Sequence, residues 1–244
     1  MTTSEFSNEF DVLINAYANN NIIGDNYDKN NLAFDEYEKS IFLTKAQEEI
    51  LLSYYNGTNS NQIGFEATEE IRRYLSDLNT HVTIDSTETD NSIKKGSLIS
   101  NAKISDKCFK IPENLWFITL ETLTLQSTNE CLNGKQLEVI PITQDEYNNV
   151  INNPFRGITN NRALRLDVEK GQLEIICKYD SYTYRIYYLS RPTPIILTDL
   201  GDLSINNIST KTECSINENL HKTILNRAVQ LAIASKIGYR TSQQ

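Results

Sequence analysis

The sequence predicts an α+β fold, in which N-terminal helices and a long C-terminal helix form a helical bundle and an antiparallel β-rich region lies in the middle. Near both ends, apolar residues recur every three or four positions, as in helices, whereas the middle is rich in β-branched and aromatic residues. We therefore expect N-terminal helices over residues 1–80, a polar loop over 81–107, a β-rich region over 108–214, and a C-terminal helix over 215–244 that packs with the N-terminal helices.

The first helix is predicted over Ser4–Ala18, where large apolar residues share one stripe. These residues are Phe6, Phe10, Ile14 and Tyr17. A helix this short is marginal in water unless its stripe is buried. Two partners can bury it: the chain's own helices, or another protein reached across the polar connector that follows.

The second helix is expected to begin at Thr44, because Thr44 and Gln47 have the spacing of a capping box. On this interpretation residues 32–43 are extended, while a competing interpretation starts the helix at Asp35. Gly57 should end the helix, since glycine readily adopts the left-handed conformation of a C-cap.

A third helix is predicted over Glu66–Leu78, with its apolar residues in helical register. The following stretch, from Thr80 to Asp106, is polar and poor in bulky apolar residues. It favours a long loop or a hairpin.

The middle of the chain has the alternation of a sheet. The clearest hairpin joins Ala163–Val168 to Gln172–Tyr179, with Gly171 in the turn. A later strand should end before Pro192 or lie at a sheet edge, because proline lacks the N–H that a ladder needs. Between strands, Thr143–Glu146 has the spacing of a capping box for a short helix.

The last helix should begin at a capping box of Ser215 and Glu218 and end at Gly238. Its apolar residues cover more than one stripe, so we expect wide burial.

Bulk charge argues against a protein that grips DNA by neutralising its phosphates. The net charge is −9 and the pI is about 4.9, whereas that kind of binding needs a basic patch. The sequence contains no long apolar run and no signal-peptide pattern at its start, so no membrane segment is predicted. We expect the protein to assemble in a cytoplasm.

No catalytic, cofactor-binding or metal-ligating residue is predicted. The four cysteines lie far apart in sequence, without the close pairs that zinc sites use, so we interpret them as buried thiols. Phosphate loops, dinucleotide fingerprints and nucleophile elbows are absent from the sequence. These observations predict that the protein is not an enzyme.

Two groups of residues are candidates for contacts with other proteins. Arg156, Arg162 and Arg165 lie in a polar-dense stretch, where guanidinium groups can bind the carboxylates of a neighbouring subunit or help tie the loop by its own hydrogen bonds. Contact with the phosphates of DNA is a third and less favoured interpretation. Tyrosines also cluster near the end of the β-rich region, at Tyr179, Tyr182, Tyr184, Tyr187 and Tyr188. In an acidic chain, an interface is favoured over a core or a base-stacking platform.

Several phrases of the sequence resemble the neck (ring) proteins of crAss-like bacteriophages, short-tailed viruses of Bacteroidales. They are FSNEFDVLINAY, YEKSIFLTKAQEEI, GFEATEEIRRYLSDL, IPENLWFITLETLTL, NPFRGITNNRALRLD and RIYYLSRPTPIIL, in that order along most of the chain. These phrases are structural rather than catalytic.

The resemblance implies a structural protein of the virion that connects head and tail. It implies a homo-oligomeric ring, dodecameric, that contacts the portal protein and other neck or tail rings and lets DNA pass through its centre. With the polar connector, it favours a neighbouring subunit or the portal as the partner of the first helix. Alternatives are another tail or cargo component of a phage, or a carbohydrate-binding module or hydrolase built on the β-rich region.

Overall fold

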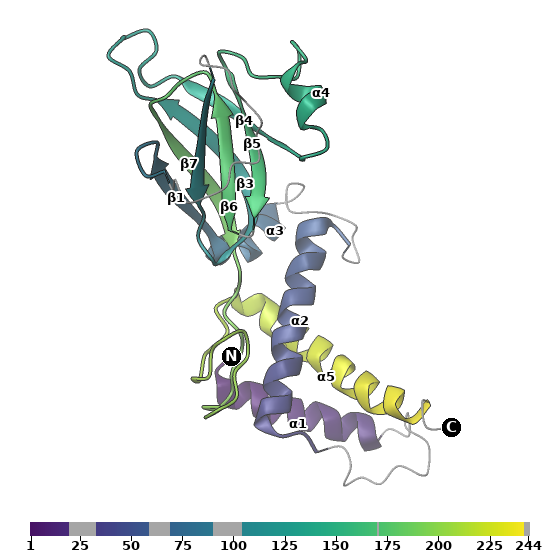
Figure 1. Cartoon of the computed structure of the whole chain (residues 1–244). Coiled ribbons are helices and arrows are strands. Elements are labelled where there is room, and N and C mark those ends of the chain that lie inside the picture. The colour runs from purple at the N-terminus through teal and green to yellow at the C-terminus, as the bar shows by residue number, and fades with distance from the viewer. Residues whose placement is uncertain (20–32, 59–68, 90–103, 170, 242–244) are drawn as a thin grey trace. The chain divides into compact units, whose positions relative to one another are not determined.

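The computed structural model describes residues 1–19, 33–58, 69–89, 104–169 and 171–241 (Figure 1). The chain divides into two compact units. The helical unit comprises Met1–Leu78 and Pro192–Gln244, and the sheet unit comprises Asn79–Arg191. The fold is therefore mixed α and β, as predicted. Residues 192–214, which the sequence placed with the β-rich region, group with the helices instead.

The helical unit contains α1 (Thr3–Asn19), α2 (Glu36–Asn56), the short α3 (Glu69–Tyr74) with a 3₁₀ turn at Ser76–Leu78, and α5 (Glu218–Thr241). Figure 1 shows α5 beside both α1 and α2, and it packs against both. The first helix is confirmed to within one residue at each end. For the third helix, α3 and the 3₁₀ turn lie within the predicted range, while residues 66–68 fall outside the described part.

Helix α2 begins eight residues before the predicted start. Its N-cap is Asp35, whose side chain accepts from the Glu38 backbone while the Glu38 side chain accepts from the Asp35 backbone. The capping box is therefore at Asp35, as the competing interpretation held, and the extended segment predicted before Thr44 is wrong from Glu36 onward. Gly57 is the C-cap, with φ of 70°, as predicted.

Thr44 and Gln47, which were predicted to form the capping box, lie inside α2 and bind another segment of the chain. Ser40, Thr44 and Gln47 lie on one face of the helix and are buried. They bond to an extended segment of the same unit, residues 193–197: Thr44 Oγ1 accepts from Ile195 N at 3.1 Å and Ser40 Oγ accepts from Leu197 N at 3.1 Å. On its other side the segment forms a two-bond backbone bridge between Ile196 and Thr212. The polar side chains of α2 thus pair the backbone N–H groups of Ile195 and Leu197 that this bridge does not use.

Helix α5 also departs from the predicted bounds. It begins at Glu218, where Asn217 Oδ1 accepts from the Asn219 backbone, and it runs through Gly238 to Thr241. The proposed cap, Ser215, accepts instead from the Thr193 hydroxyl. Burial follows one face rather than several: Leu220, Ile224, Leu225, Ala228, Val229 and Ala232 are buried. Asn226, Arg227 and Gln230 are exposed on the opposite face.

The sheet unit holds one seven-stranded sheet in the order β1-β7-β3-β4-β5-β6-β2. Its strands are β1 (Asn79–Asp85), β2 (Ser105–Lys110), β3 (Leu115–Leu125), β4 (Gln136–Ile142), β5 (Arg162–Glu169), β6 (Gln172–Cys177) and β7 (Tyr182–Ser190). The predicted hairpin is β5–β6, with Gly171 at φ of 76°. Strand β7 ends before Pro192 and lies inside the sheet.

Two predictions about this region are corrected. Strand β1 lies where the sequence indicated a polar loop, because Thr80, Val82 and Ile84 point into the sheet unit while the residues between them face solvent. The sheet is also not wholly antiparallel, since β4 and β5 pair in parallel. The connection between them contains α4 (Tyr147–Ile151), as a parallel crossover requires.

The sheet curls around its own core, so that its two ends approach each other. Phe109, on edge strand β2, packs against Tyr182 and Tyr184 of β7, with ring centroids 6.3 and 6.1 Å apart. Tyr182, Tyr184 and Tyr188 are therefore core residues. The interface interpretation of the tyrosine cluster is wrong for these three residues, because their alternate positions on β7 all face inward.

Helix α4 covers the outer face of β4, β5 and β6. Tyr147 and Val150 of the helix form a small second core with strand residues, which are Ile142, Leu164, Leu166 and Ile176. The helix was predicted, but its N-cap is Glu146 without a side-chain hydrogen bond, so the capping box from Thr143 is not formed. This core holds α4 and the turn after it on the sheet.

Candidate interface surfaces

Arg165 does not point outward to a partner. It lies in the sheet unit with 11% of its side chain exposed and donates from Nη1 to Glu121 Oε1, while its Nε lies 3.2 Å from Asp167 Oδ1. The second carboxylate oxygen of Glu121 accepts from the Tyr184 hydroxyl at 3.1 Å. Arg165 thus binds carboxylates of its own chain rather than those of a neighbouring subunit, and it does so from a strand and not from a loop.

Arg162 is likewise used within the chain, but close to the surface. Its Nη1 donates to the carbonyl oxygen of Phe155 at 2.6 Å, and its Nε lies 3.9 Å from Glu138 Oε2. Arg156, by contrast, is exposed. Arg156 belongs to the turn that contains Phe155, and Arg162 bonds to the backbone of that turn. Arg165 instead lies in the interior of the sheet unit.

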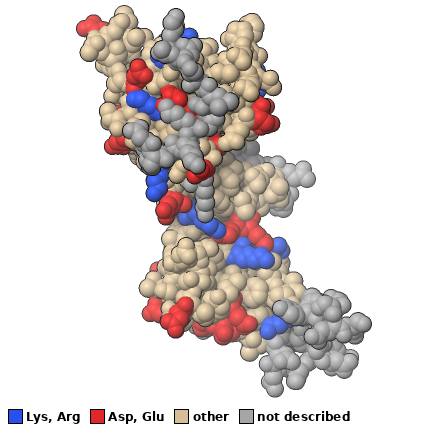
Figure 2. Space-filling view, in the orientation of Figure 1, with Lys and Arg blue, Asp and Glu red and all other residues tan. Residues whose placement is uncertain are grey.

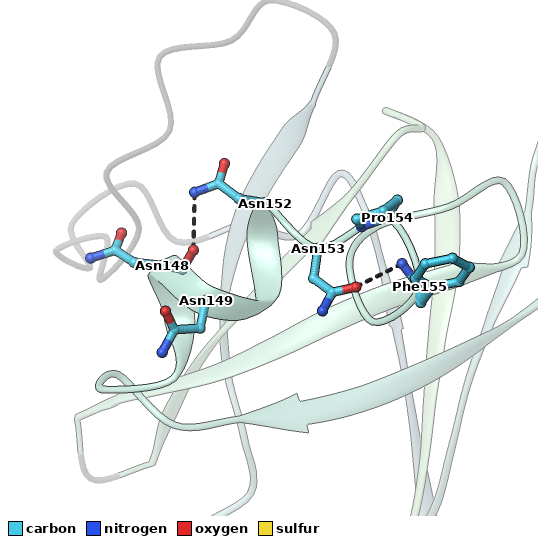
Figure 3. A pocket seen from close by; sticks show the side chains of 6 residues that line it. All are labelled: Asn148, Asn149, Asn152, Asn153, Pro154 and Phe155. Atoms are coloured by element: carbon cyan, nitrogen blue, oxygen red, sulfur yellow. Dashed lines mark hydrogen bonds between the residues drawn. The ribbon is translucent and has the colours of Figure 1, made fainter.

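This turn, Asn153–Gly157, follows α4 and is named here the Phe155 turn (Figure 3). Asn153 Oδ1 accepts from the backbone N–H groups of Phe155 and Arg156 at 2.8 and 3.2 Å, and the Gly157 N–H donates to the Asn153 carbonyl at 2.7 Å. An asparagine whose side-chain oxygen accepts hydrogen bonds from the backbone two and three residues later fixes the backbone of that turn. The turn is therefore held from both its side chain and its main chain.

Gly157 permits this close packing. A Cβ at this position would lie 2.6 Å from the Asn153 carbonyl oxygen and 2.9 Å from that of Val150, which are backbone atoms that cannot move aside cheaply. The ring of Phe155 stands outside the turn, with 85% of the residue exposed. Beside it, Asn148, Asn149, Asn152, Asn153 and Pro154 line an open hollow of about 560 Å³ (Figure 3).

The stripe of the first helix is buried by the chain itself. Phe6 and Phe10 are fully buried and Ile14 is 3% exposed, whereas Tyr17 is 36% exposed. The Phe6 ring lies 5.5 Å from His221 of α5, and the Phe10 ring lies 5.9 Å from Phe34, which precedes α2. The structure thus places this stripe in the helical unit, the first of the two partners weighed from the sequence.

A buried lysine strengthens the attachment of α1 to α2. Lys39 of α2 donates to Asp11 Oδ2 at 2.7 Å, to Glu36 Oε1 at 3.0 Å and to the Ser7 hydroxyl at 3.1 Å. Burial alone would lower the pKa of Lys39, but the hydrogen bonds to Asp11 and Glu36 outweigh it and raise the pKa above its usual value. The charged form is therefore the one that joins the two helices.

The described residues offer little that resembles catalytic chemistry. They contain no group of three or more His, Cys, Asp and Glu residues placed to hold a metal ion. Cys108 and Cys177 are buried, as predicted, and burial raises the pKa of Cys177 to about 11. Cys131 is exposed and Cys214 is partly exposed, so the prediction of buried thiols is wrong for Cys131. No helix in the described ranges has the length and hydropathy to cross a membrane.

Basic side chains do not form a continuous patch on the face that Figure 2 shows. Among the described residues drawn there, Lys and Arg lie scattered between Asp and Glu on both units. This distribution matches the net charge of −9 and lacks the basic stripe that phosphate binding uses.

Two exposed residues escaped sequence reasoning. Phe155 was noted only as part of a polar-dense stretch, and Leu120, 54% exposed on β3, was counted as an ordinary strand residue. Neither the composition of these two segments nor the spacing of their apolar residues indicates that the side chains of Phe155 and Leu120 are exposed to solvent. The signal for Phe155 was the dipeptide Asn153–Pro154 followed three residues later by Gly157, which marks a tight turn whose middle side chains face solvent.

Comparison with known proteins gives a consistent result. A family described as "Phage tail ring protein 3/4" matches residues 1–244. The chain is 43% identical over 240 residues to "Ring protein 3" of Bacteroides phage crAss001, covering 97% of this chain and 96% of that relative. It is 31% identical over 247 residues to "Ring protein 4/5" of the same phage, covering 98% of this chain and 94% of the relative.

Proposed function

Because the chain belongs to the phage tail ring protein 3/4 family of crAss-like bacteriophages, we propose that it forms a ring of the virion neck. In this proposal the ring is dodecameric, connects the portal protein to the tail, contacts other neck or tail ring proteins, and surrounds the channel through which DNA leaves. The observation that carries the proposal is the 43% identity to a ring protein over 97% of this chain.

The charge of the chain supports a role around DNA that passes without sticking. At a net charge of −9 per chain, a ring of copies presents a strongly acidic surface, and like charges repel the DNA phosphates. A wall of this kind confines DNA by repulsion, whereas a basic wall would bind it and slow its exit.

The internal chemistry also supports a structural role. The strongest raised pKa values among the described residues belong to Tyr182, Tyr184 and Cys177, and burial is the first cause for all three. These groups lie in the core of the sheet unit rather than in a cleft with convergent polar groups. We propose accordingly that the chain is not an enzyme, that α1, α2 and α5 act as one helical bundle, and that the ring assembles in the host cytoplasm before the virion is complete.

The proposal is tested by mixing the purified chain with the portal protein of the same phage. Size-exclusion chromatography should give a complex, and negative-stain images should show a ring coaxial with the portal. If the chain stays monomeric beside the portal and in the presence of the other neck proteins, the neck assignment fails. A tail or cargo role then becomes the better explanation. Turnover of a glycan substrate by the purified chain would instead support the hydrolase alternative.

A further inference from the structure

Part of the outer face of the sheet carries exposed side chains beside a covering helix. Helix α4 packs on that face over β4, β5 and β6, whereas Leu120 of β3 is 54% exposed and Arg185 of β7 is exposed as well. Arg185 points away from the core, because Tyr184 and Ile186 on either side of it belong to the inner core. A partner that packs beside α4 would complete this layer.

Strand pairing links Arg185 to the Phe155 turn across the outer face. Arg185 pairs with Thr122 of β3, and Thr122 pairs with Glu138 of β4. Glu138 in turn pairs with Arg162 of β5, which donates to the Phe155 carbonyl oxygen. Three strand spacings of about 4.8 Å, roughly 14 Å in all, therefore separate Arg185 from the arginine that holds the turn.

We name this surface the outer patch, and its residues are Leu120, Arg156, Phe155, Arg185 and Tyr187. Leu120 pairs with Tyr187 in the floor of the patch, and Phe155, 85% exposed, stands on the turn beside that floor. The width of roughly 14 Å is close to the diameter of one α-helix with its side chains, about 10–12 Å. The dimensions therefore fit a single partner helix that contacts the sheet with one face.

The charge of the outer patch selects an acidic partner. Arg156 and Arg185 are exposed, and the patch contains no carboxylate. The exposed carboxylate of Glu138 nearby lies 3.9 Å from Arg162, which offsets its charge. The patch is thus positive in a chain whose net charge is −9, so a helix that carries carboxylates around an apolar residue is its complement.

Helix α1 has this character on its solvent face. It contains Glu5, Glu9 and Asp11 but no Lys or Arg, and Asp11 is already bonded to Lys39. Glu5, Glu9 and Val12 are exposed at helical spacing, with Val12 66% exposed. The opposite face of α1 is buried in its own helical unit, so the helix can present Val12 and its carboxylates without leaving the core.

We infer that α1 of one copy lies on the outer patch of the adjacent copy in the ring, with Val12 against Leu120 and Phe155 and with Glu9 beside the arginines. This inference rests on the proposed function, since it assigns the contact that joins the subunits. The two surfaces belong to different compact units, as a ring needs, because each copy uses one surface toward the next copy and another toward the previous one. A second copy is favoured over another acidic protein because ring neighbours hold this helix at high effective concentration.

The first test is a cross-link between copies. Val12→Cys and Leu120→Cys are introduced together into phage that also carries Cys131→Ser, because Cys131 is an exposed native thiol. Purified particles are treated with a short bismaleimide, which joins two thiols over a longer reach than a disulfide does. A denaturing gel should show a ladder of covalent multimers of this chain. Each single-cysteine variant, which retains the partly exposed Cys214, should show the monomer.

The other outcomes of this test separate the inference from the proposed function. If the double variant is present in particles but remains monomeric, the contact assigned here is wrong while the ring role stands. A cross-link from Leu120→Cys alone to a different virion protein also overturns the inference and assigns the outer patch to that protein. If the wild-type chain is absent from particles, the proposed function fails, and the inference falls with it.

A second test exchanges the charges of the contact. Glu9→Lys or Arg185→Glu alone should lower incorporation of the chain into particles by about tenfold or more, because each substitution brings like charges together. The two substitutions in one chain should restore incorporation. Asp202→Lys is the matched control, since it makes the same charge change at an exposed residue of the helical unit outside α1, and it should assemble as the wild type does. Failure of the double variant to recover incorporation would overturn the inference.

Discussion

Arg165 on β5 reaches past β4 to donate to the carboxylate of Glu121 on β3, and both side chains are nearly excluded from solvent. The pair lies inside the curled sheet, where Tyr184 of β7 donates to the other oxygen of Glu121. One ionic network therefore joins β3, β5 and β7, which are not all neighbours in the sheet.

Breaking this pair from one side should destabilise the sheet unit strongly. Arg165→Met leaves the Glu121 carboxylate buried without its cation, and the expected loss in the free energy of unfolding is about 3–5 kcal/mol. Urea unfolding followed by circular dichroism measures it. Glu138→Gln is the control, because it removes the exposed partner of a 3.9 Å pair and should cost less than about 1 kcal/mol. Equal midpoints for the two variants would contradict the network.

Removing the hydroxyl group should affect the stability of the protein differently at two tyrosines on β7. Tyr182 has a buried hydroxyl without a hydrogen-bond partner among the described residues, whereas Tyr184 donates to Glu121. Tyr182→Phe should leave the melting temperature unchanged or higher, and Tyr184→Phe should lower stability by about 1–3 kcal/mol. Calorimetry near neutral pH compares the two variants, and a larger loss for Tyr182→Phe would be inconsistent with this structure.

The same burial predicts sensitivity to alkali. Burial raises the pKa of Tyr182 and Tyr184 in the folded state above the usual value of 10.0. Above pH 10 the unfolded chain therefore binds fewer protons than the folded chain, so the free energy of unfolding falls as pH rises. Each group contributes a slope of about 1.4 kcal/mol per pH unit. Cys177, whose pKa burial raises from 9.0 to about 11, adds a loss that begins near pH 9. Urea midpoints measured from pH 8 to 11 should therefore drop from about pH 9 and more steeply above pH 10, and the drop above pH 10 should be smaller in Tyr182→Phe.

Thr44 tests the bonds between α2 and the segment at residues 193–197. Thr44→Val keeps the shape of the side chain but leaves the buried N–H of Ile195 without its acceptor, at a cost of about 1–3 kcal/mol. Thr44→Ser retains the hydroxyl and should recover most of that loss. If valine and serine give the same unfolding midpoint, the hydroxyl does not hold this segment.

Phe10 and Val12 test whether the first helix belongs to the core of the helical unit or is a docking arm, meaning a helix whose apolar stripe is buried by another protein. Phe10 is fully buried in the helical unit and Val12, two residues later on the same helix, is 66% exposed. Phe10→Ala should cost about 3–5 kcal/mol of stability, whereas Val12→Ala should cost well under 1 kcal/mol. Thermal melts of the isolated chain measure the stability losses of the two variants. A Phe10→Ala protein that melts like the wild type but no longer joins the neck would instead support the docking arm.

The fold was predictable where a local sequence pattern is compatible with only one secondary structure. The β5–β6 hairpin has alternation on both strands and a glycine between them, and α1 has a single stripe, so both follow from the sequence. The start of α2 was misplaced because Thr44 and Gln47 have the spacing of a cap but bond to a segment about 150 residues away in sequence. A partner that distant leaves no local signal.

The interface residues were harder to predict for a related reason. The same residue types serve the interior and the surface, so tyrosines on β7 resemble an interface although alternate ones form the core. The arginines divide similarly between a buried pair at Arg165 and a surface turn at Arg156 and Arg162. Exposure depends on how the sheet curls and where α4 lies, and these are set by packing between distant segments.

The central claim, that this chain is a ring of the neck around the DNA channel, is tested most directly by cryo-electron microscopy of intact virions. A reconstruction of the head-to-tail junction should contain a closed ring, coaxial with the portal, into which the helical unit and the sheet unit each fit as separate bodies. Density for this chain found away from the junction, or in an assembly without rotational symmetry about the channel, would contradict the claim.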